Sequence, residues 1–274
     1  MRTYITGTKL SPDQIGIFYL GQTGYLLKYR DKYIIIDAYL SDYVDKHCCT
    51  EAVKWVRNYP SPIKPEELNF VDYVFCTHSH FDHADPDTLA PLARINKKAK
   101  FYVPAPIVET IRSYGVEAER IYPLHDGENV CLDADISVTA IKAAHEDFHT
   151  DEFGDYCELG YKFELGGTHI FHAGDGCPYD GLEERLGNCE ILIVPINGRD
   201  YYRTNILDII GCFNCREAVI LARAIGAELL IPTHFDLYDV NCVNPSIFVE
   251  ELRQINQTQK FHIFVPGERY MYAQ

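Results

Sequence analysis

Residues 77–83, which read THSHFDH, place three histidines and an aspartate within six positions. An apolar run at residues 73–76 precedes this stretch, and Asp85 followed by Pro86 is typical of a helix start. The stretch is therefore predicted to be a strand-to-helix loop. Its imidazole and carboxylate ligands suit Zn, Mn or Fe better than Ca or Mg, so the pattern predicts a metal site rather than a histidine-rich surface loop. The candidate ligands in this loop are His78, His80, Asp82 and His83.

Three further polar residues stand where apolar strands are predicted to stop, namely His145, Asp175 and His234. Because the ends of strands can meet at one edge of a sheet, these side chains can join the residues of the first motif. The combined set of five histidines and two aspartates is large enough to hold two ions. It also leaves coordination positions for water, as a catalytic site requires.

Apolar periodicity predicts alternating strands and helices along the chain. The predicted strands are 15–20, 24–29, 33–37, 73–76, 100–103, 130–144 around a turn at 133–135, 159–165, 169–173, 191–196, 229–232 and 261–265. The predicted helices are 51–57, 87–95, 107–114, 216–225 and 245–255. No linker divides the chain convincingly, so residues 1–274 are expected to form a single domain.

The charge of the chain limits its partners. It has 25 basic and 40 acidic residues, a formal net charge of −15 and a pI near 5.1, which argues against a nucleic-acid partner. No apolar run has the length of a membrane span, and the N-terminus lacks the pattern of a signal peptide. We therefore expect no membrane partner and a cytoplasmic location.

Ten cysteines are scattered through the sequence, and without a signal peptide we expect free thiols. Cys48 and Cys49 are adjacent, and Cys212 and Cys215 form a C-x-x-C pair that could serve a redox or metal function. That pair has no second C-x-x-C at zinc-ribbon spacing and does not follow a strand as in a thioredoxin motif. Free thiols without a redox or metal-binding function are the preferred interpretation.

These motifs resemble those of the metallo-β-lactamase superfamily of hydrolases, with its H-x-H-x-D-H motif, isolated histidine, aspartate after glycine and last histidine. The resemblance implies an α/β (α+β) fold, the four-layer αββα sandwich, with two divalent metal ions, Zn or Mn, at one edge of its two sheets. It also implies that His78, His80 and His145 hold one ion, that Asp82, His83 and His234 hold the other, and that Asp175 bridges them.

Within the superfamily the chain looks most like the L-ascorbate-6-phosphate lactonase-like branch, through residues 21–24, 37–42, 65–68, 83–86 and 196–200. The resemblance implies a hydrolase that opens a small ester or lactone, for example a phosphorylated sugar-acid lactone such as L-ascorbate 6-phosphate. A metal-bound hydroxide would attack the carbonyl, so no serine nucleophile is needed. The catalytic candidates are Asp82 and Asp175, and Asp175 could orient the hydroxide or shuttle its proton.

Residues beyond the metal ligands are candidates for contact with the substrate. Arg199 and Arg203, with Tyr201 and Tyr202 between them, follow a predicted strand end and could hold a phosphate by paired guanidinium hydrogen bonds, although an ordinary surface loop is the alternative. Asn197, just before them, is a further candidate. His149 lies either at the mouth of the pocket or on the surface. Asp37 ends a strand and either supports a metal ligand or caps a turn.

Two other functions remain open. The first is hydrolysis of a small phosphodiester, such as a cyclic nucleotide or a phospholipid headgroup, because a metal pair can stabilise both oxygens of such a reaction. The second is a non-catalytic metal-binding sensor or scaffold, which is disfavoured because no ligand position is lost. In each case we expect a small-molecule partner, and a homo-oligomer is possible.

Overall fold

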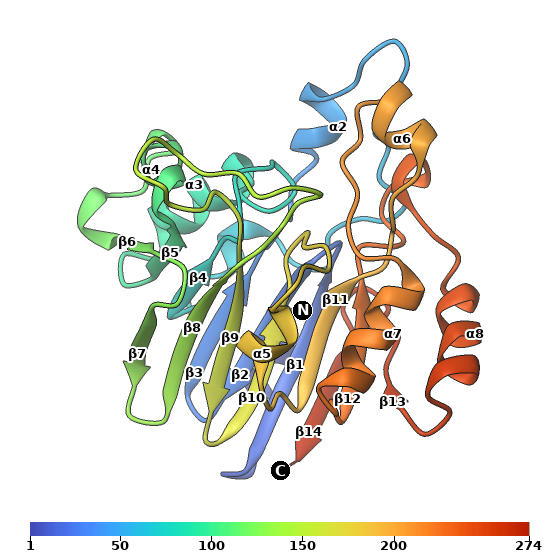
Figure 1. Cartoon of the computed structure of the whole chain (residues 1–274). Coiled ribbons are helices and arrows are strands. Elements are labelled where there is room, and N and C mark those ends of the chain that lie inside the picture. The colour runs from blue at the N-terminus through green and yellow to red at the C-terminus, as the bar shows by residue number, and fades with distance from the viewer. Residues whose placement is uncertain (274) are drawn as a thin grey trace.

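A computed structural model describes residues 1–273 (Figure 1), in which two seven-stranded sheets pack face to face. The first sheet has the order β14 (Arg269–Ala273), β1 (Gln14–Gly21), β2 (Gly24–Tyr29), β3 (Lys32–Ile36), β4 (Tyr73–Phe75), β5 (Lys100–Pro104) and β6 (Ile121–Leu124). The second has the order β13 (Lys260–Phe261), β12 (Leu229–Thr233), β11 (Ile191–Pro195), β10 (Thr168–His172), β9 (Leu159–Leu165), β8 (Ile136–Lys142) and β7 (Asn129–Asp133).

The two sheets share one pattern of strand direction. Strands β14, β1, β2 and β3 are antiparallel neighbours, and β3 to β6 are parallel. In the second sheet β7 to β10 are antiparallel neighbours, and β10 to β13 are parallel. The carboxyl ends of the parallel strands in one sheet meet at a common edge, where ligand sites of α/β sheets typically form.

Aromatic and branched side chains fill the space between the sheets. Phe75 of the first sheet lies with its ring centroid 5.1 Å from that of Tyr161 and 5.0 Å from that of Phe163 in the second. Tyr19 and Ile36 are also fully buried in this cluster. Because large buried side chains contribute most of the apolar area removed from water, this layer holds the two sheets together.

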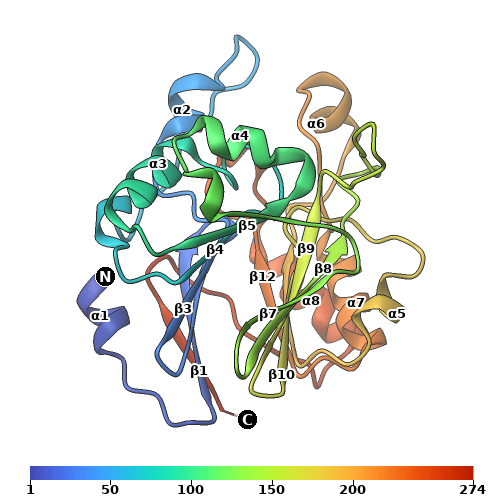
Figure 2. The ribbon, with the colours of Figure 1, turned by 90° about the vertical axis from the view of Figure 1, so that its left-hand side faces the viewer.

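The helices form the outer layers, as the view in Figure 2 shows. They are α1 (Arg2–Gly7), α2 (Tyr43–His47), α3 (Pro86–Ile95), α4 (Val108–Ser113), α5 (Leu182–Leu186), α6 (Tyr201–Ile206), α7 (Cys215–Ala224) and α8 (Pro245–Ile255). Leu92 of α3 packs in the cluster outside the first sheet, and Val219 of α7 and Leu252 of α8 pack outside the second. The predicted four-layer αββα sandwich is therefore confirmed.

The helix predicted at residues 51–57 is wrong, because this segment is irregular and the nearby helix is α2. Its backbone groups bond to side chains instead of to one another: the Val53 amide donates to Thr50 Oγ1 at 3.0 Å, and the Arg57 amide donates to Asp45 Oδ2 at 2.7 Å. Tertiary contacts also favour an extended course, since Trp55 packs edge-on against Tyr238 at 5.1 Å.

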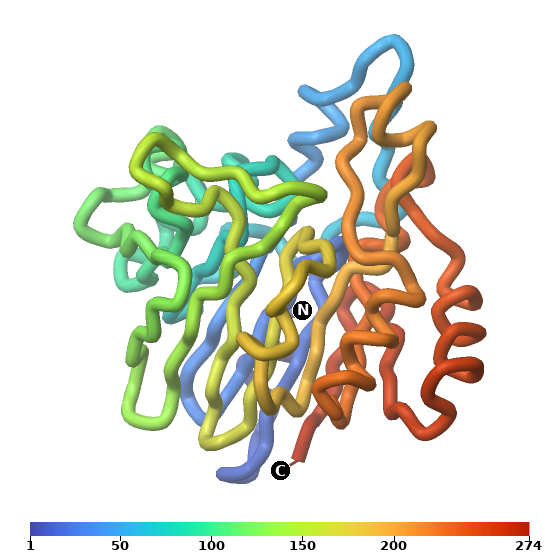
Figure 3. Tube along the Cα trace, in the orientation of Figure 1, coloured from blue at the N-terminus to red at the C-terminus, as the bar shows by residue number. Residues whose placement is uncertain are grey.

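Several elements were not predicted, including β6, β14, α1, α5 and α6, while the strand predicted at residues 261–265 is paired only at its start. The trace in Figure 3 shows that the segments around α2 and α6 project beyond the same end of the sandwich. Within residues 1–273, no helix combines the length and apolar character needed to cross a membrane. All ten cysteines, which lie in the described residues, have free thiols.

Candidate metal centre

The THSHFDH loop is held by its own turn and by the helix that follows. The His80 carbonyl accepts hydrogen bonds from the amides of His83 at 3.0 Å and Ala84 at 2.8 Å. Asp85 then caps α3 by accepting from the Asp87 amide at 3.0 Å, and it also accepts from the Ser41 hydroxyl at 2.9 Å. Burial raises the pKa of Asp85 to about 6. The cap fixes where α3 begins and therefore where the loop ends.

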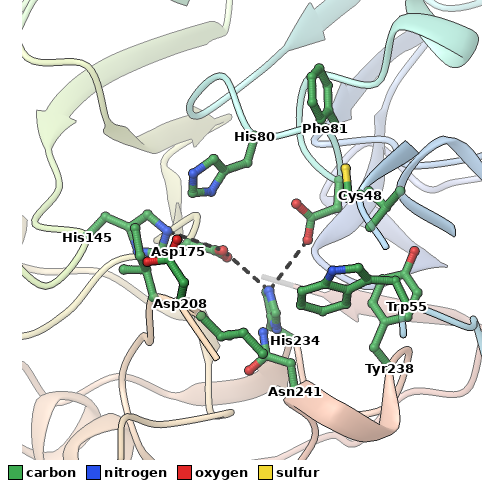
Figure 4. Close-up of a pocket in the computed structure, with 14 residues that line it drawn as sticks. Cys48, Trp55, His80, Phe81, His145, Asp175, Asp208, His234, Tyr238 and Asn241 are labelled. Carbon is green, nitrogen blue, oxygen red and sulfur yellow. Dashed lines mark ion pairs between the residues drawn. The ribbon is translucent and has the colours of Figure 1, made fainter. Parts of the chain in front are cut away.

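The structure brings all seven predicted ligands together at one edge of the sandwich. They form two groups, and within each group one ligand atom per residue lies within 4.8 Å of all the others. The first group is His78, His80, His145 and Asp175, and the second is Asp82, His83, Asp175 and His234. Figure 4 shows several of these side chains pointing toward one another. Asp175 belongs to both groups, which is the position expected of a bridging carboxylate.

Asp175 lies at the centre because it follows β10, a buried strand in the middle of the second sheet. Its Oδ2 is 3.1 Å from His83 Nε2, 3.3 Å from His234 Nε2 and 3.9 Å from His145 Nε2. The preceding Gly174 has a φ of +57°, and a Cβ there would lie 2.8 Å from the Thr77 side chain. Only glycine lets the chain turn here without pushing into the first motif.

Asp37 holds the THSHFDH loop through hydrogen bonds to Thr77 and His83. Its Oδ2 lies 2.8 Å from His83 Nδ1, and its two oxygens accept from the Thr77 amide at 2.8 Å and the Thr77 hydroxyl at 2.7 Å. A carboxylate behind a metal-binding histidine fixes the ring orientation and makes the other nitrogen a better ligand. Of the two roles considered for Asp37, the geometry favours support of a ligand.

The histidines of the cluster differ in the direction in which their pKa values are shifted. Burial lowers the pKa of His145 to about 4 and lowers the pKa values of His78 and His80, so these rings are neutral at pH 7. Burial also opposes a charge on His83, but the carboxylates of Asp175, Asp82 and Asp37 outweigh it and raise the His83 pKa. Neutral imidazole is the form that binds metal, so a ring that is protonated must lose its proton when an ion binds.

Unpaired buried atoms test whether the cluster fits a metal. Among residues 1–273, the buried side-chain atoms without a hydrogen-bond partner include His83 Nε2, His145 Nδ1, Asp175 Oδ1 and His234 Nδ1. Buried polar groups are normally paired, so several unpaired atoms in one cluster indicate that it is completed by a further group. The donor set of imidazoles and carboxylates fits a divalent transition metal.

A pocket of about 210 Å³ opens onto this cluster. Its walls come from the two projecting segments and from the chain after β12, and they are largely apolar and aromatic. The lining residues are Val44, Cys48, Trp55, His80, Phe81, Asp82, His145, Asp175, Asp208, Ile209, Ile210, His234, Tyr238 and Asn241. Outside the two ligand groups, Asp208 supplies a carboxylate and Asn241 a carboxamide to the wall.

The predicted substrate contacts do not line this pocket. The Arg199 guanidinium pairs with Glu217 and donates to the Cys212 carbonyl at 2.6 Å. Asn197 is buried and donates to Asn241 Oδ1 at 3.1 Å, so it supports a wall residue from behind. Tyr201 is 76% exposed, and the His149 side chain, 49% exposed, faces Glu158. The proposed phosphate contact of Arg199 therefore lacks a free guanidinium at the site.

Gln22 was missed as a site residue although it lies in the turn between β1 and β2. Its Nε2 is 2.8 Å from Asp82 Oδ2 and 3.0 Å from His234 Nε2. The pocket residues Trp55 and Tyr238 were also missed. The turn sequence gave the only available signal, because Gln22 reaches the cluster through contacts between distant parts of the chain.

Comparison with known proteins agrees with this geometry. Residues 32–235 match the family described as the β-lactamase superfamily domain. A UPF0173 metal-dependent hydrolase from Methanosarcina mazei is 26% identical over 257 residues, 92% of this chain and 96% of that protein. One from Methanoculleus marisnigri is 29% identical over 208 residues, 72% and 80% of the two chains.

Solved structures show the same fold. The isothiocyanate hydrolase from Delia radicum gut bacteria has a TM-score of 0.75 at 17% identity, covering 94% of this chain and 100% of that chain. Igni18, a metallo hydrolase from Ignicoccus hospitalis, has a TM-score of 0.71 at 18% identity, with 95% and 99% covered. With the family match over most of the chain and all seven ligand positions in place, this chain belongs to the metallo-β-lactamase superfamily.

Proposed function

We propose that this protein hydrolyses a small, uncharged ester or lactone. The observation that carries the proposal is the pocket itself, in which the ligand cluster faces walls that include Trp55, Phe81 and Ile209. No lysine or arginine lines it among residues 1–273. Its volume of about 210 Å³ is below the ~300–1,000 Å³ of pockets for drug-sized ligands, which favours a small substrate.

The proposed ligand roles follow the two groups of the cluster. His78, His80 and His145 hold one ion, Asp82, His83 and His234 hold the other, and Asp175 contributes to both. When bound, two divalent ions supply Lewis acidity that activates water and polarises a carbonyl. The physiological ions are proposed to be Zn or Mn.

The protein's own groups position the reactants. Asp175 Oδ1 is buried without a partner, so it can accept a hydrogen bond from the attacking water and receive its proton. Asp82 holds its place through Gln22 and keeps a second carboxylate at the pocket floor. The apolar walls exclude bulk water from the rest of the substrate and bind its hydrocarbon part.

The contacts of Arg199 do not favour the phosphorylated lactone that the sequence suggested as substrate. Arg199 is paired with Glu217 at the N-terminal end of α7, and neither residue lines the pocket. Recognition of a phosphate normally uses a free guanidinium or ammonium. An unphosphorylated ester or lactone agrees better with the walls, and the same walls disfavour a phosphodiester.

The test is a substrate panel with Zn- and Mn-loaded protein. p-Nitrophenyl butyrate and unphosphorylated γ- and δ-lactones should be hydrolysed with higher kcat/KM than a phosphorylated sugar lactone or bis-p-nitrophenyl phosphate. Protein carrying Ile209→Asp, which places a charge on the apolar wall, should lose kcat/KM on the ester chiefly through KM. Preference for the phosphorylated lactone or the phosphodiester would overturn the proposal, as would fully metal-loaded protein that hydrolyses no ester or lactone.

A further inference from the structure

The backbone amide and carbonyl of Gln22 are both hydrogen-bonded. Gln22 has a φ of +57°, a left-handed conformation that costs about 1–2 kcal/mol for a residue other than glycine. Its amide donates to Tyr59 Oη at 3.1 Å, and its carbonyl accepts from Thr233 Oγ1 at 2.6 Å, the His234 amide at 3.1 Å and Tyr19 Oη at 3.0 Å. A strained residue held by four hydrogen bonds is expected to have a role in positioning.

The side chain of Gln22 reaches one ligand group only. Its Nε2 donates to Asp82 Oδ2 at 2.8 Å and lies 3.0 Å from His234 Nε2, while the residue is 2% exposed. Asp82 and His234 both belong to the second group and not to the first. The carboxamide therefore restrains two of the four ligands at a single position.

A second restraint acts on the same group. Asp37 holds His83 through a hydrogen bond between two fully buried side chains. In the first group, His78 Nδ1 has the Thr77 hydroxyl at 3.0 Å and His80 Nδ1 lies 3.0 Å from His78 Nε2, but within residues 1–273 no carboxylate or amide from outside the group hydrogen-bonds to these two rings. His145 Nδ1 is buried without a partner, as is His234 Nδ1 in the second group. Three of the four ligands in the second group are thus contacted by an amide or a carboxylate. Asp37 holds His83 at Nδ1, away from Asp175, whereas Gln22 holds Asp82 and His234 at the atoms that face the cluster, Oδ2 and Nε2.

We propose that Gln22 is a positioning residue that preorganises Asp82 and His234, so that the position formed by Asp82, His83, Asp175 and His234 takes up a divalent ion first. The argument rests on the metal-binding function proposed above. Ligands already held in place lose less conformational freedom on binding, and two carboxylates in the group add charge attraction for a cation. The protein should therefore load in two unequal steps.

The experiment measures metal binding without substrate. Metal-free protein is titrated with Zn²⁺ in competition with a chromophoric chelator, and crystals prepared at one equivalent of Zn²⁺ are analysed by anomalous diffraction. The wild-type protein should bind in two steps, with the first ion located at the second group. This experiment measures metal binding and not turnover, so its outcome is independent of the proposed hydrolysis. A protein that hydrolyses no ester could still bind its two ions in unequal steps, and a protein that binds them in equal steps could still be a hydrolase.

Gln22→Met keeps the length of the side chain and the backbone strain but removes the donor. It should weaken the tighter step by about 10- to 100-fold, the usual effect of losing a partner that orients a ligand. Gln254→Met, the same change on the exposed face of α8, should alter neither step. The melting temperature of the metal-free Gln22→Met protein should stay close to that of the wild type, which separates ligand positioning from loss of the fold.

A double-mutant cycle separates action through Asp82 from a merely structural effect. In Asp82→Asn protein, adding Gln22→Met should weaken Zn²⁺ binding by a smaller factor than it does in the wild type, because only the contact of Gln22 with His234 is then left to lose. Full additivity of the two changes would overturn the proposal. So would a first ion located at His78, His80 and His145, or a Gln22→Met protein that binds Zn²⁺ as tightly as the wild type.

Discussion

His83 Nδ1 and Asp37 Oδ2 lie 2.8 Å apart, and neither side chain has any exposed surface. The two residues come from neighbouring parallel strand ends, since Asp37 follows β3 and His83 follows β4 by a short loop. The contact sets the orientation of the ring whose Nε2 faces Asp175. The metal centre is therefore supported from within the first sheet.

Replacing Asp37 should impair both metal binding and folding. Asp37→Ala leaves the Thr77 amide and His83 Nδ1 buried with a lost partner, at a cost of about 1–3 kcal/mol in the free energy of unfolding. Affinity for Zn²⁺ should fall by about 10- to 100-fold. Asp37→Asn, which tolerates the φ of +45°, should lose less stability than Asp37→Ala. Urea unfolding of metal-free protein and chelator competition measure the two effects, and unchanged affinity in both variants would contradict the assigned role.

Removing the shared carboxylate should affect both ions. Asp175→Asn keeps the shape of the side chain but takes away the negative charge common to the two ligand groups. The reconstituted variant should hold less than one ion per chain by elemental analysis. Asp208→Asn removes a carboxylate of the same pocket that belongs to neither group, and it should keep the wild-type metal content. Equal metal content in the two variants would argue against bridging by Asp175.

Arg199→Ala should act on stability rather than on substrate choice. The Arg199 side chain is 29% exposed, pairs with Glu217 and donates to the Cys212 carbonyl. Losing hydrogen bonds to a charged group should lower the free energy of unfolding by about 1.5–3 kcal/mol. The ratio of kcat/KM for a phosphorylated and an unphosphorylated lactone should stay constant. A selective loss on the phosphorylated lactone would restore the phosphate role that the sequence suggested.

Glu117 should make stability depend on acid pH. A hydrogen bond from Lys97, with Arg120 nearby, lowers the pKa of Glu117 from 4.5 to about 2. Because the pKa is lower in the folded state, the stabilisation is present above about pH 4.5 and is lost as the pH falls toward 2. The side chain is 35% exposed, so screening should limit the effect to about 1 kcal/mol.

Urea unfolding between pH 3 and pH 7 tests this dependence. The difference in the free energy of unfolding between the wild type and Glu117→Gln should shrink as the pH falls. Glu109→Gln, which changes an exposed carboxylate on α4, is the matched control and should show a smaller difference. A difference that stays constant down to pH 3 would rule out Glu117 as its source.

Two adjacent glycines should differ sharply in their tolerance of alanine. A Cβ at Gly166 would overlap with the buried Tyr29 hydroxyl, whereas a Cβ at Gly167 would meet nothing within 4 Å. Both have positive φ, so each alanine should cost about 1–2 kcal/mol of backbone strain. Gly166→Ala should cost about 1–3 kcal/mol more through overpacking. Thermal unfolding compares the two, and equal losses would show that strain alone decides the outcome.

The ligands could be predicted because strand ends carry a local signal. His145, Asp175 and His234 each follow an apolar run, and the chain can place such residues at one sheet edge without further information. The two sheets were predictable for the same reason, since their buried strands have strong periodicity. Strand β14 was missed because it pairs with β1 from the far end of the sequence and has only one buried residue, Tyr272.

What the sequence could not give are pairings between distant residues. Arg199 resembled a free phosphate ligand until Glu217 on α7 was found beside it. Gln22 resembled a turn residue until the β1–β2 turn was found against His234. The helix predicted at residues 51–57 failed because Asp45 and Cys49 offer its amides other partners. Each outcome depends on contacts between residues that are not neighbours in the sequence, and the local sequence pattern does not predict such contacts.

The two sheets contribute to the metal centre from opposite sides: four cluster residues follow β4, and the other three follow β8, β10 and β12. An ion held by either group therefore acts as a cross-link between the two halves of the sandwich, in addition to their apolar packing and to hydrogen bonds such as that from Thr233 Oγ1 to the Gln22 carbonyl. Binding to the folded state alone raises stability in proportion to the logarithm of free metal concentration. Chelation should accordingly speed hydrogen exchange first in the loops at this edge, and the protein's lifetime against unfolding would follow the metal supply of its surroundings.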